Sequence, residues 1–306
     1  MLTGLNKETP SFFLFHINLE QSCENAKLFI KPSWMTSIAF FIIDACIKEM
    51  TERREPVKDD PRVKIYMMVL FALILSGCYR ETKVPIPAIY YETNAMRDNC
   101  TLFVYLPGNG DSPEAFKKNG LFRYVQERGI AAEMVGVDAH LGYYSDNSLV
   151  IRLKEDVIDP ARFRGSRNIW LVGDSLGGLG SLMYIRKHAG EIAGIVLLGP
   201  FVGDKEIIEE IKHSGGLQNW DPGNVRETDW QRQLWVWLKE YVSDRHYLPP
   251  IYLGYGKSDR FAYAQELLAA NLPPERVVAI EGGHNWQTWS ALWKLFVERI
   301  SFDNCH

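Results

Sequence analysis

Three side chains in this sequence have the chemistry needed to activate a hydroxyl group: Ser175, Asp259 and His284. A serine hydroxyl is a poor nucleophile at neutral pH, and it needs a neutral imidazole within hydrogen-bond reach to take its proton. The imidazole in turn needs a carboxylate that holds its tautomer and its orientation. These residue types therefore predict nucleophilic attack by Ser175 on a carbonyl group, provided that the fold brings the three together.

Ser175 lies in a G-x-S-x-G pattern that occupies residues 173–177. Residues 169–172 before it are apolar β-formers, and residues 179–187 after it have the character of a helix. A serine at a sharp strand-to-helix turn is a nucleophile elbow, whose glycines permit close packing and whose serine is strained. The alternative is a glycine-rich turn without chemistry. We expect the neighbouring Asp174 to make a structural hydrogen bond rather than to serve as the acid of the site.

The histidine that fits best is His284, in a glycine-containing loop directly after the predicted strand 276–280. Loops at the carboxyl ends of parallel strands are where ligands gather, so they can supply the partners of Ser175. His140 also follows a predicted strand and is the serious rival. The remaining histidines have simpler explanations, at a helix end, in an insert or near the chain ends: His16, His188, His213, His246 and His306.

Asp259 is the candidate acid because it directly follows the predicted strand 250–255. Its rivals, Asp221 and Asp229, lie in a stretch where surface solvation explains them more simply. The oxyanion of a tetrahedral intermediate also needs backbone N–H donors. One expected donor is Leu176, and the other is expected in the Pro-Gly-Asn-Gly loop at residues 107–110, unless that loop is a simple glycine turn.

Strand-like and helical segments alternate along most of the chain, which predicts a parallel sheet with helices on both faces. Residues 94–99 are expected to form a hairpin turn between the first two strands. The predicted strands are residues 88–93, 101–106, 131–137, 169–172, 192–198, 250–255 and 276–280. The predicted helices are residues 113–128, 149–163, 179–188, 261–270 and 285–300.

Residues 201–247 interrupt this alternation, contain no clear strand and carry four tryptophans, at 220, 230, 235 and 237. We interpret them as a small cap over Ser175. The tryptophans either line an apolar pocket for an acyl group or bury the cap against the core. In the last helix, Trp286, Trp289, Trp293 and Phe296 recur at helical spacing, which is typical of core positions.

From about residue 91 to residue 300, the chain resembles the serine hydrolases of the α/β-hydrolase fold. The order of Ser175, Asp259 and His284 is the order found in that family. The resemblance implies an α/β fold, a carboxylesterase that works through an acyl-enzyme on Ser175, and oxyanion donors at Asn109 and Leu176. It implies no metal and no cofactor. Many members have His-Gly where this chain has Pro107 and Gly108, which leaves the N–H donors themselves in place.

The same triad chemistry also serves thioesterases and peptidases, and specificity depends on the cap, so these activities are alternatives. A catalytically idle hydrolase fold that acts as an envelope binding module is an alternative of another class. The favoured partner is a small ester. A net charge of −4 gives no reason to expect nucleic acid.

A second resemblance concerns residues 63–78, where Arg62 and Lys64 flank the start of an apolar run that ends in Leu-Ser-Gly-Cys. The run has the layout of a secretory signal and is too short to span a bilayer. Its end resembles the lipobox of bacterial lipoproteins, which implies a signal peptide at 63–77 and a lipid-anchored Cys78 in the cell envelope, most simply on the periplasmic face of the outer membrane. An apolar core helix or strand is the alternative.

If Cys78 is an anchor, residues 1–62 are a misassigned extension, 78–87 a tether, and 88–306 the hydrolase domain. The five cysteines show no zinc-like spacing. Cys100 and Cys305 are then the thiols that remain in an oxidising compartment, where they either pair or stay free.

Overall fold

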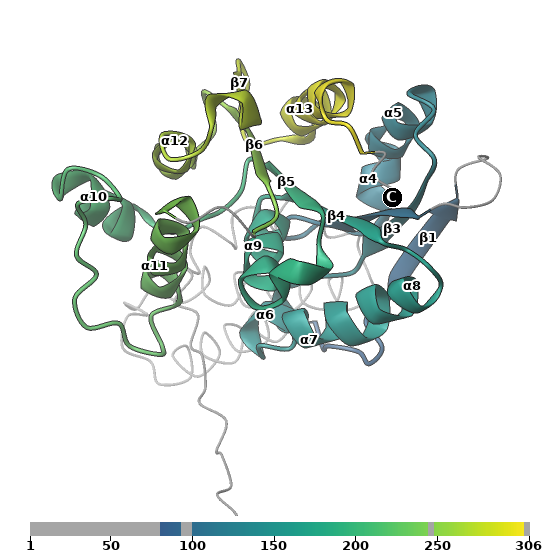
Figure 1. Ribbon diagram of the computed structural model, residues 1–306, viewed down its shortest axis with the longest axis horizontal. Coiled ribbons are helices and arrows are strands. Elements are labelled where there is room, and N and C mark those ends of the chain that lie inside the picture. The colour runs from purple at the N-terminus through teal and green to yellow at the C-terminus, as the bar shows by residue number, and fades with distance from the viewer. Residues whose placement is uncertain (1–79, 93–99, 244–247, 303–306) are drawn as a thin grey trace, which may run out of the picture. The chain divides into compact units, whose positions relative to one another are not determined.

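Short apolar runs form a seven-stranded sheet in which six strands are parallel and the first runs antiparallel to its neighbour. The computed structural model describes residues 80–92, 100–243 and 248–302. The strand order is β1-β3-β2-β4-β5-β6-β7 (Figure 1). The strands are β1 Ala88–Glu92, β2 Thr101–Leu106, β3 Ala132–Val137, β4 Asn168–Asp174, β5 Gly194–Leu198, β6 Ile251–Gly256 and β7 Val277–Ile280.

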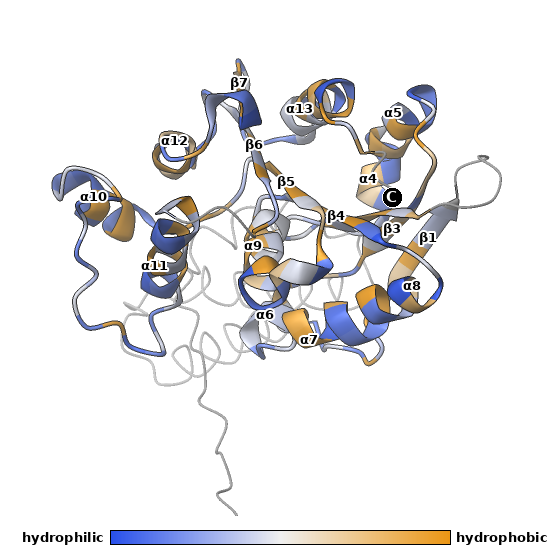
Figure 2. Ribbon diagram, viewed as in Figure 1, coloured by the Kyte–Doolittle hydropathy of each residue, from blue (hydrophilic) through white to orange (hydrophobic). Residues whose placement is uncertain are grey.

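Helices cover both faces of the sheet, as the alternation of segments predicts (Figure 1). They are α4 Glu114–Lys118, α5 Leu121–Glu127, α6 Leu141–Ser145, α7 Leu149–Leu153, α8 Asp159–Phe163, α9 Leu176–His188, α10 Lys205–His213, α11 Trp230–Ser243, α12 Ala262–Ala269 and α13 Trp286–Arg299. Helices α4, α5 and α13 lie on one face, and α6 to α9 lie on the other. The surface helices α5, α10 and α11 carry both apolar and polar residues (Figure 2), as helices with one buried side do.

The central strands β2, β4 and β5 are buried along their whole length. Full burial follows from helices on both faces and explains their near-continuous apolar sequences. An aromatic core fills the face under α13, where Phe103, Tyr105 and Trp293 pack together. This places the end of β4, and therefore the predicted elbow, at the centre of the sheet between β2 and β5.

The expected hairpin is wrong. Strand β1 pairs with β3, with Tyr90 opposite Val135, and β3 lies between β1 and β2. The reason is that β2 already has parallel neighbours on both sides, β3 and β4, so that on this side of the sheet β1 meets the outer edge of β3. The turn expected at residues 94–99 lies outside the described residues.

Two predicted helices have interruptions. The helix expected at 113–128 divides into α4 and α5 at Gly120, whose φ of +82° is a left-handed conformation that suits glycine. The helix expected at 149–163 is continuous from α7 to α8, but its middle turn, Lys154–Ile158, is a π-helix. The other strands and helices are confirmed, with ends that differ by a few residues.

The insert at 201–247 contains α10 and α11, and its described part, 201–243, contains no strand. Trp220 and Trp235 are almost fully buried, with Trp235 Nε1 donating to the Val202 carbonyl at 2.8 Å. Trp230 is half-buried, and its ring meets that of Phe201 at 5.9 Å between centroids. Two of the four tryptophans therefore bury the insert, and Trp230 lies near the end of β5.

The stretch expected to be a tether is attached to the domain from Thr82 onward. Tyr143 Oη accepts the Lys83 N–H at 2.9 Å, Asp156 Oδ2 accepts the Ile86 N–H at 2.8 Å, and Ile86 is buried. The expected extension 1–62, the signal 63–77 and the anchor Cys78 lie outside the described residues.

Cys100 is disulfide-bonded, so a free thiol at this position is wrong. The suggested partner, Cys305, falls outside the described residues. In the part of the chain that the structure describes, no helix is both long enough and apolar enough to cross a membrane.

Candidate active site

The turn from β4 into α9 forms the sharp elbow that the G-x-S-x-G pattern predicts. Ser175 has φ +48° and ψ −113°, a strained conformation for a residue with a side chain. A Cβ on Gly173 would collide with the backbone at Gly177, and a Cβ on Gly177 would collide with the Leu106 carbonyl. Both glycines are therefore required by the close approach of strand and helix.

A chain of hydrogen bonds joins the three predicted catalytic side chains. His284 Nε2 lies 2.9 Å from Ser175 Oγ, and His284 Nδ1 lies 2.8 Å from Asp259 Oδ2. When Nδ1–H donates to the carboxylate, Nε2 has a lone pair that accepts the serine hydroxyl proton. The structure thus unites three residues that are 109 and 25 positions apart in the sequence, from loops after β4, β6 and β7.

The Asp259 carboxylate is held on both oxygens. Its Oδ1 accepts the Phe261 N–H at 2.8 Å while its Oδ2 faces the imidazole. The Asp259 side chain is 0% exposed and that of His284 is 8% exposed. Water therefore has little access to the contact between them, which strengthens their electrostatic interaction.

The rival residues have other roles. His140 caps α6, and its Nδ1 accepts the Gly142 N–H at 3.1 Å. Asp229 pairs with Arg232, and Asp221 accepts the N–H of Gly223. Asp174 makes the structural hydrogen bond expected of it, because its Oδ2 accepts the Gly108 N–H at 2.9 Å.

Aromatic rings that the sequence did not mark as site residues surround the imidazole. Phe261 and Trp289 each meet His284 edge-on at 5.0 Å between ring centroids. Phe201 packs on Phe261, and its N–H donates to the Ser175 carbonyl at 2.9 Å. These rings fix the plane of His284 and shield it from water. Their only sequence signal is position, since Phe201 and Phe261 follow strand ends.

The two predicted oxyanion donors belong to different elements. Leu176 is the first residue of α9, so its N–H has no carbonyl acceptor within the helix and lies at the positive end of the helix dipole. Asn109 is exposed in the turn after β2, where the Asp111 N–H donates to the Gly108 carbonyl at 3.2 Å. A Cβ on Gly108 would lie 3.2 Å from the Ser175 Cβ, so this turn adjoins the nucleophile.

The strand order, the elbow after the central strand, and the loops that carry Asp259 and His284 are the features of an α/β-hydrolase fold. A family model named Esterase matches residues 157–296, a segment that contains Ser175 and both of its partners. The protein is an enzyme, a serine hydrolase that acts on ester bonds. No curated protein matches its sequence.

This hydrolase is also similar to several solved structures. One is the serine hydrolase FphF of Staphylococcus aureus, with 14% identity, a TM-score of 0.48, and coverage of 69% of this chain and 96% of that chain. Another is Est1E of Butyrivibrio proteoclasticus, with 16% identity, a TM-score of 0.49, and coverage of 69% and 90%. A third is an S-formylglutathione hydrolase of Agrobacterium tumefaciens, with 12% identity, a TM-score of 0.49, and coverage of 71% and 90%.

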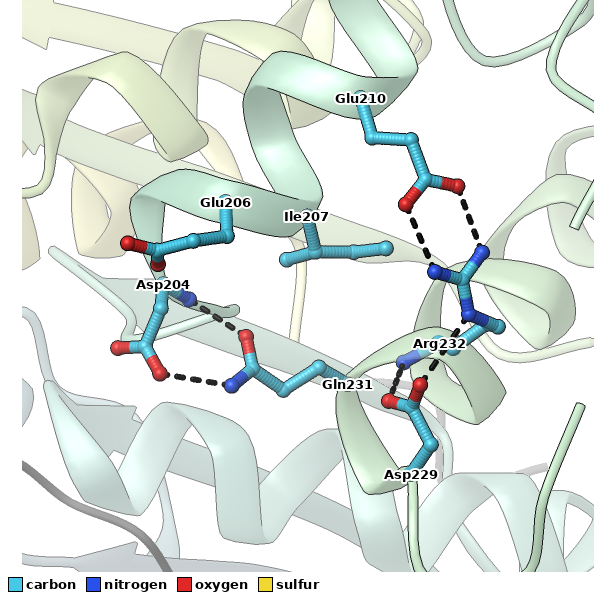
Figure 3. Close-up of a pocket in the computed structure, with 7 residues that line it drawn as sticks. All are labelled: Asp204, Glu206, Ile207, Glu210, Asp229, Gln231 and Arg232. Atoms are coloured by element: carbon cyan, nitrogen blue, oxygen red, sulfur yellow. Dashed lines mark hydrogen bonds and ion pairs between the residues drawn. The ribbon is translucent and has the colours of Figure 1, made fainter.

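A polar cavity of about 200 Å³ lies between α10 and α11 of the hydrolase (Figure 3). Gln231 joins its walls by donating to Asp204 and accepting the Asp204 N–H. Arg232 joins Glu210 and Asp229 on the other side. None of the three catalytic candidates lines this cavity. Its polar groups are largely paired with one another, and they fix α10 against α11.

Proposed function

We propose that the protein hydrolyses carboxylic esters through a covalent acyl-enzyme on Ser175, with His284 as general base and acid and Asp259 as the residue that orients it. The observation that supports this most directly is the unbroken hydrogen-bond chain from Ser175 Oγ through the imidazole to the buried carboxylate. The two distances and the burial of the carboxylate support the roles proposed for the three residues.

In the acylation step, the Ser175 oxygen attacks the ester carbonyl carbon while its proton passes to His284 Nε2. The resulting oxyanion accepts hydrogen bonds from the N–H groups of Leu176 and Asn109. The intermediate collapses when the C–O bond to the alcohol breaks and the imidazolium returns its proton to the leaving oxygen. The products of this step are a free alcohol and an acylated Ser175.

In the deacylation step, His284 takes a proton from water and the hydroxide oxygen attacks the acyl carbon. The second tetrahedral intermediate collapses, the serine oxygen leaves, and the imidazolium reprotonates it. The carboxylic acid is released and the enzyme returns to its starting state. Asp259 stays ionised throughout and stabilises the imidazolium.

The half-buried aromatic side chains beside the triad favour an ester with an apolar part. Phe201 and Phe261 lie on the side of the insert, and Trp286 is half-buried at the opposite loop. Contact with such rings excludes water and stabilises bound apolar groups. Thioesters and peptides share the triad chemistry, and the esterase match is the reason to prefer an ester.

Wild-type protein should hydrolyse short p-nitrophenyl esters, and Ser175→Ala should reduce turnover to the background rate. Turnover measured over a series of acyl chain lengths then shows how long an acyl group the apolar side chains accommodate. If the protein hydrolysed thioesters but no oxygen esters, thioesterase activity would replace the esterase activity proposed here. A folded wild type that turns over no ester, thioester or peptide would support the binding-module alternative instead.

We further propose that the enzyme works in the bacterial cell envelope, anchored by a lipid on Cys78. The disulfide at Cys100 supports an oxidising compartment, because cytosolic thiols are kept reduced. Attachment of the chain to the domain from Thr82 onward leaves the anchor close in sequence to the folded unit. Mass spectrometry of the native N-terminus should show a lipidated Cys78, whereas an intact Met1 peptide would contradict the proposal.

A further inference from the structure

The elbow carries a second polar side chain that the triad mechanism does not use. Asp174 is the last residue of β4, and it is 0% exposed. Its Oδ2 accepts the Gly108 N–H at 2.9 Å, while its Oδ1 has no hydrogen-bond partner among the described residues. A fully buried carboxyl with one unpartnered oxygen is costly and calls for an explanation.

The hydrogen bond from Gly108 determines where the turn after β2 lies. Asp174 holds its first residue, Gly108, and Trp286 Nε1 holds its last by donating to Asp111 Oδ2 at 3.1 Å. Within the turn, the Asp111 N–H donates to the Gly108 carbonyl. The Gly108 N–H is used by Asp174 and the Asp111 N–H by the Gly108 carbonyl. The next N–H along the turn after Gly108, that of Asn109, is the one that we assign to the oxyanion.

Gly108 packs closely against both Asp174 and Ser175, without room for even one added carbon atom. A Cβ added to Gly108 would lie 2.6 Å from Asp174 Oδ2 and 3.2 Å from the Ser175 Cβ. The carboxyl, the turn and the nucleophile are thus in mutual contact. A displacement of the turn would move the Asn109 N–H relative to the Ser175 oxygen, and oxyanion donors act only at hydrogen-bond distance.

The surroundings of Asp174 favour its neutral form. Burial raises the pKa of the Asp174 carboxyl well above its usual range, and the charge of Asp111 raises it further. Tyr144, on α6, is the titratable group on the helix side, and its hydroxyl donates to the Leu176 carbonyl. No basic side chain forms an ion pair with Asp174 within the described ranges. A neutral carboxyl still accepts the Gly108 N–H through one oxygen and carries its proton on the other.

We propose that Asp174 is a positioning residue of the esterase reaction, which holds Gly108 so that the Asn109 N–H is aimed at the oxyanion. It acts as a hydrogen-bond acceptor and needs no charge. The proposal rests on the proposed function of Ser175. It assigns to the second residue of the elbow a role separate from that of the triad acid, Asp259.

Two substitutions separate the acceptor from the charge. Asp174→Asn keeps an oxygen that can accept the Gly108 N–H, and its amide group replaces the unpartnered oxygen. Asp174→Leu has a similar size and no acceptor. With p-nitrophenyl acetate as substrate, Asp174→Leu should lower kcat by about 10- to 100-fold, since one oxyanion donor is displaced rather than removed. KM should change little, and Asp174→Asn should restore most of kcat.

A matched control tests the loss of a carboxyl-to-backbone hydrogen bond as such. Asp156 Oδ2 accepts the Ile86 N–H at 2.8 Å, and the same carboxylate also pairs with Arg152 at 3.1 Å. Asp156→Leu therefore removes a carboxyl-to-backbone hydrogen bond and an ion pair away from Ser175. Asp156→Leu should lower the melting temperature and leave kcat unchanged. If Asp174→Leu fails to fold, Trp286→Phe releases the other end of the turn, because phenylalanine cannot donate to Asp111. Phenylalanine keeps an aromatic ring, so kcat should fall by a larger factor than KM rises.

Equal kcat in wild type and Asp174→Leu would overturn the proposal, and so would a loss in Asp174→Asn as large as that in Asp174→Leu. These outcomes are distinct from a failure of the proposed function. If Ser175 is not the nucleophile, Ser175→Ala hydrolyses the ester as fast as wild type. If only the Asp174 proposal fails, Ser175→Ala is inactive and Asp174→Leu keeps the wild-type kcat.

Discussion

The Asp259 carboxylate and the His284 imidazole form a buried hydrogen bond, with Oδ2 2.8 Å from Nδ1 and the carboxylate fully shielded from solvent. This contact selects the tautomer that carries its proton on Nδ1. The other ring nitrogen is thereby available to Ser175 Oγ at 2.9 Å. The reactivity of the serine therefore depends on a carboxylate that does not touch it.

Asp259→Asn should lower kcat by about 10⁴-fold, because the amide can donate to Nδ1 and then favours the wrong tautomer. The Phe261 N–H still finds an acceptor on the amide oxygen, so the fold is expected to survive. Steady-state kinetics and circular dichroism measure the two effects. Asp229→Asn is the control. If kcat fell in this variant and not in Asp259→Asn, the acid of the site would be Asp229, in the insert.

His284→Gln should abolish ester turnover, since glutamine cannot accept the Ser175 proton at neutral pH and return it. His140→Gln is the comparison, because His140 caps α6 and lies in the loop of the rival assignment. We expect that variant to retain turnover. If turnover depends on His140 and not on His284, the assignment of the base is wrong.

Gly108→Ala should lower kcat, because its Cβ would lie 2.6 Å from Asp174 Oδ2 and must push the turn away from Ser175. The loss should appear in kcat more than in KM if the turn carries an oxyanion donor. Gly190→Ala is the matched control, since a Cβ at that position meets nothing within 4 Å. An unchanged kcat in Gly108→Ala would show that the turn has no part in the reaction.

The stability difference between Asp174→Asn and wild type should depend on pH. The folded state raises the pKa of Asp174 above its ordinary value of 3.8, so the folded protein keeps this proton while the unfolded chain loses it. The contribution of Asp174 to stability is thus full below pH 3.8 and falls as the pH rises toward the folded pKa.

The amide side chain of the Asp174→Asn variant does not titrate, so the free energy of unfolding of this variant relative to wild type should increase as the pH rises from about 4 to 8. Urea unfolding across this range measures the difference. Asp221→Asn removes an exposed carboxylate and serves as the control for net charge. A difference for Asp174→Asn that is constant with pH would contradict a raised pKa.

The sequence predicts the layers of the fold because apolar runs and helical periods are local. It also predicts Ser175, Asp259 and His284, since each lies directly after a predicted strand. It does not predict that β3 separates β1 from β2, because pairing depends on which edges remain open. The Gly108 contact with Asp174 and the ring contacts of Phe261 and Trp289 also depend on distant segments, and no local pattern encodes them.

The most direct test of the central claim is covalent labelling by a fluorophosphonate probe, mapped by peptide mass spectrometry. In wild type, the adduct should lie on Ser175, since only an activated serine attacks the phosphorus at an appreciable rate. Labelling should disappear in Ser175→Ala and nearly disappear in His284→Gln. A wild type that is folded but unlabelled, or one labelled at another residue, would contradict the account.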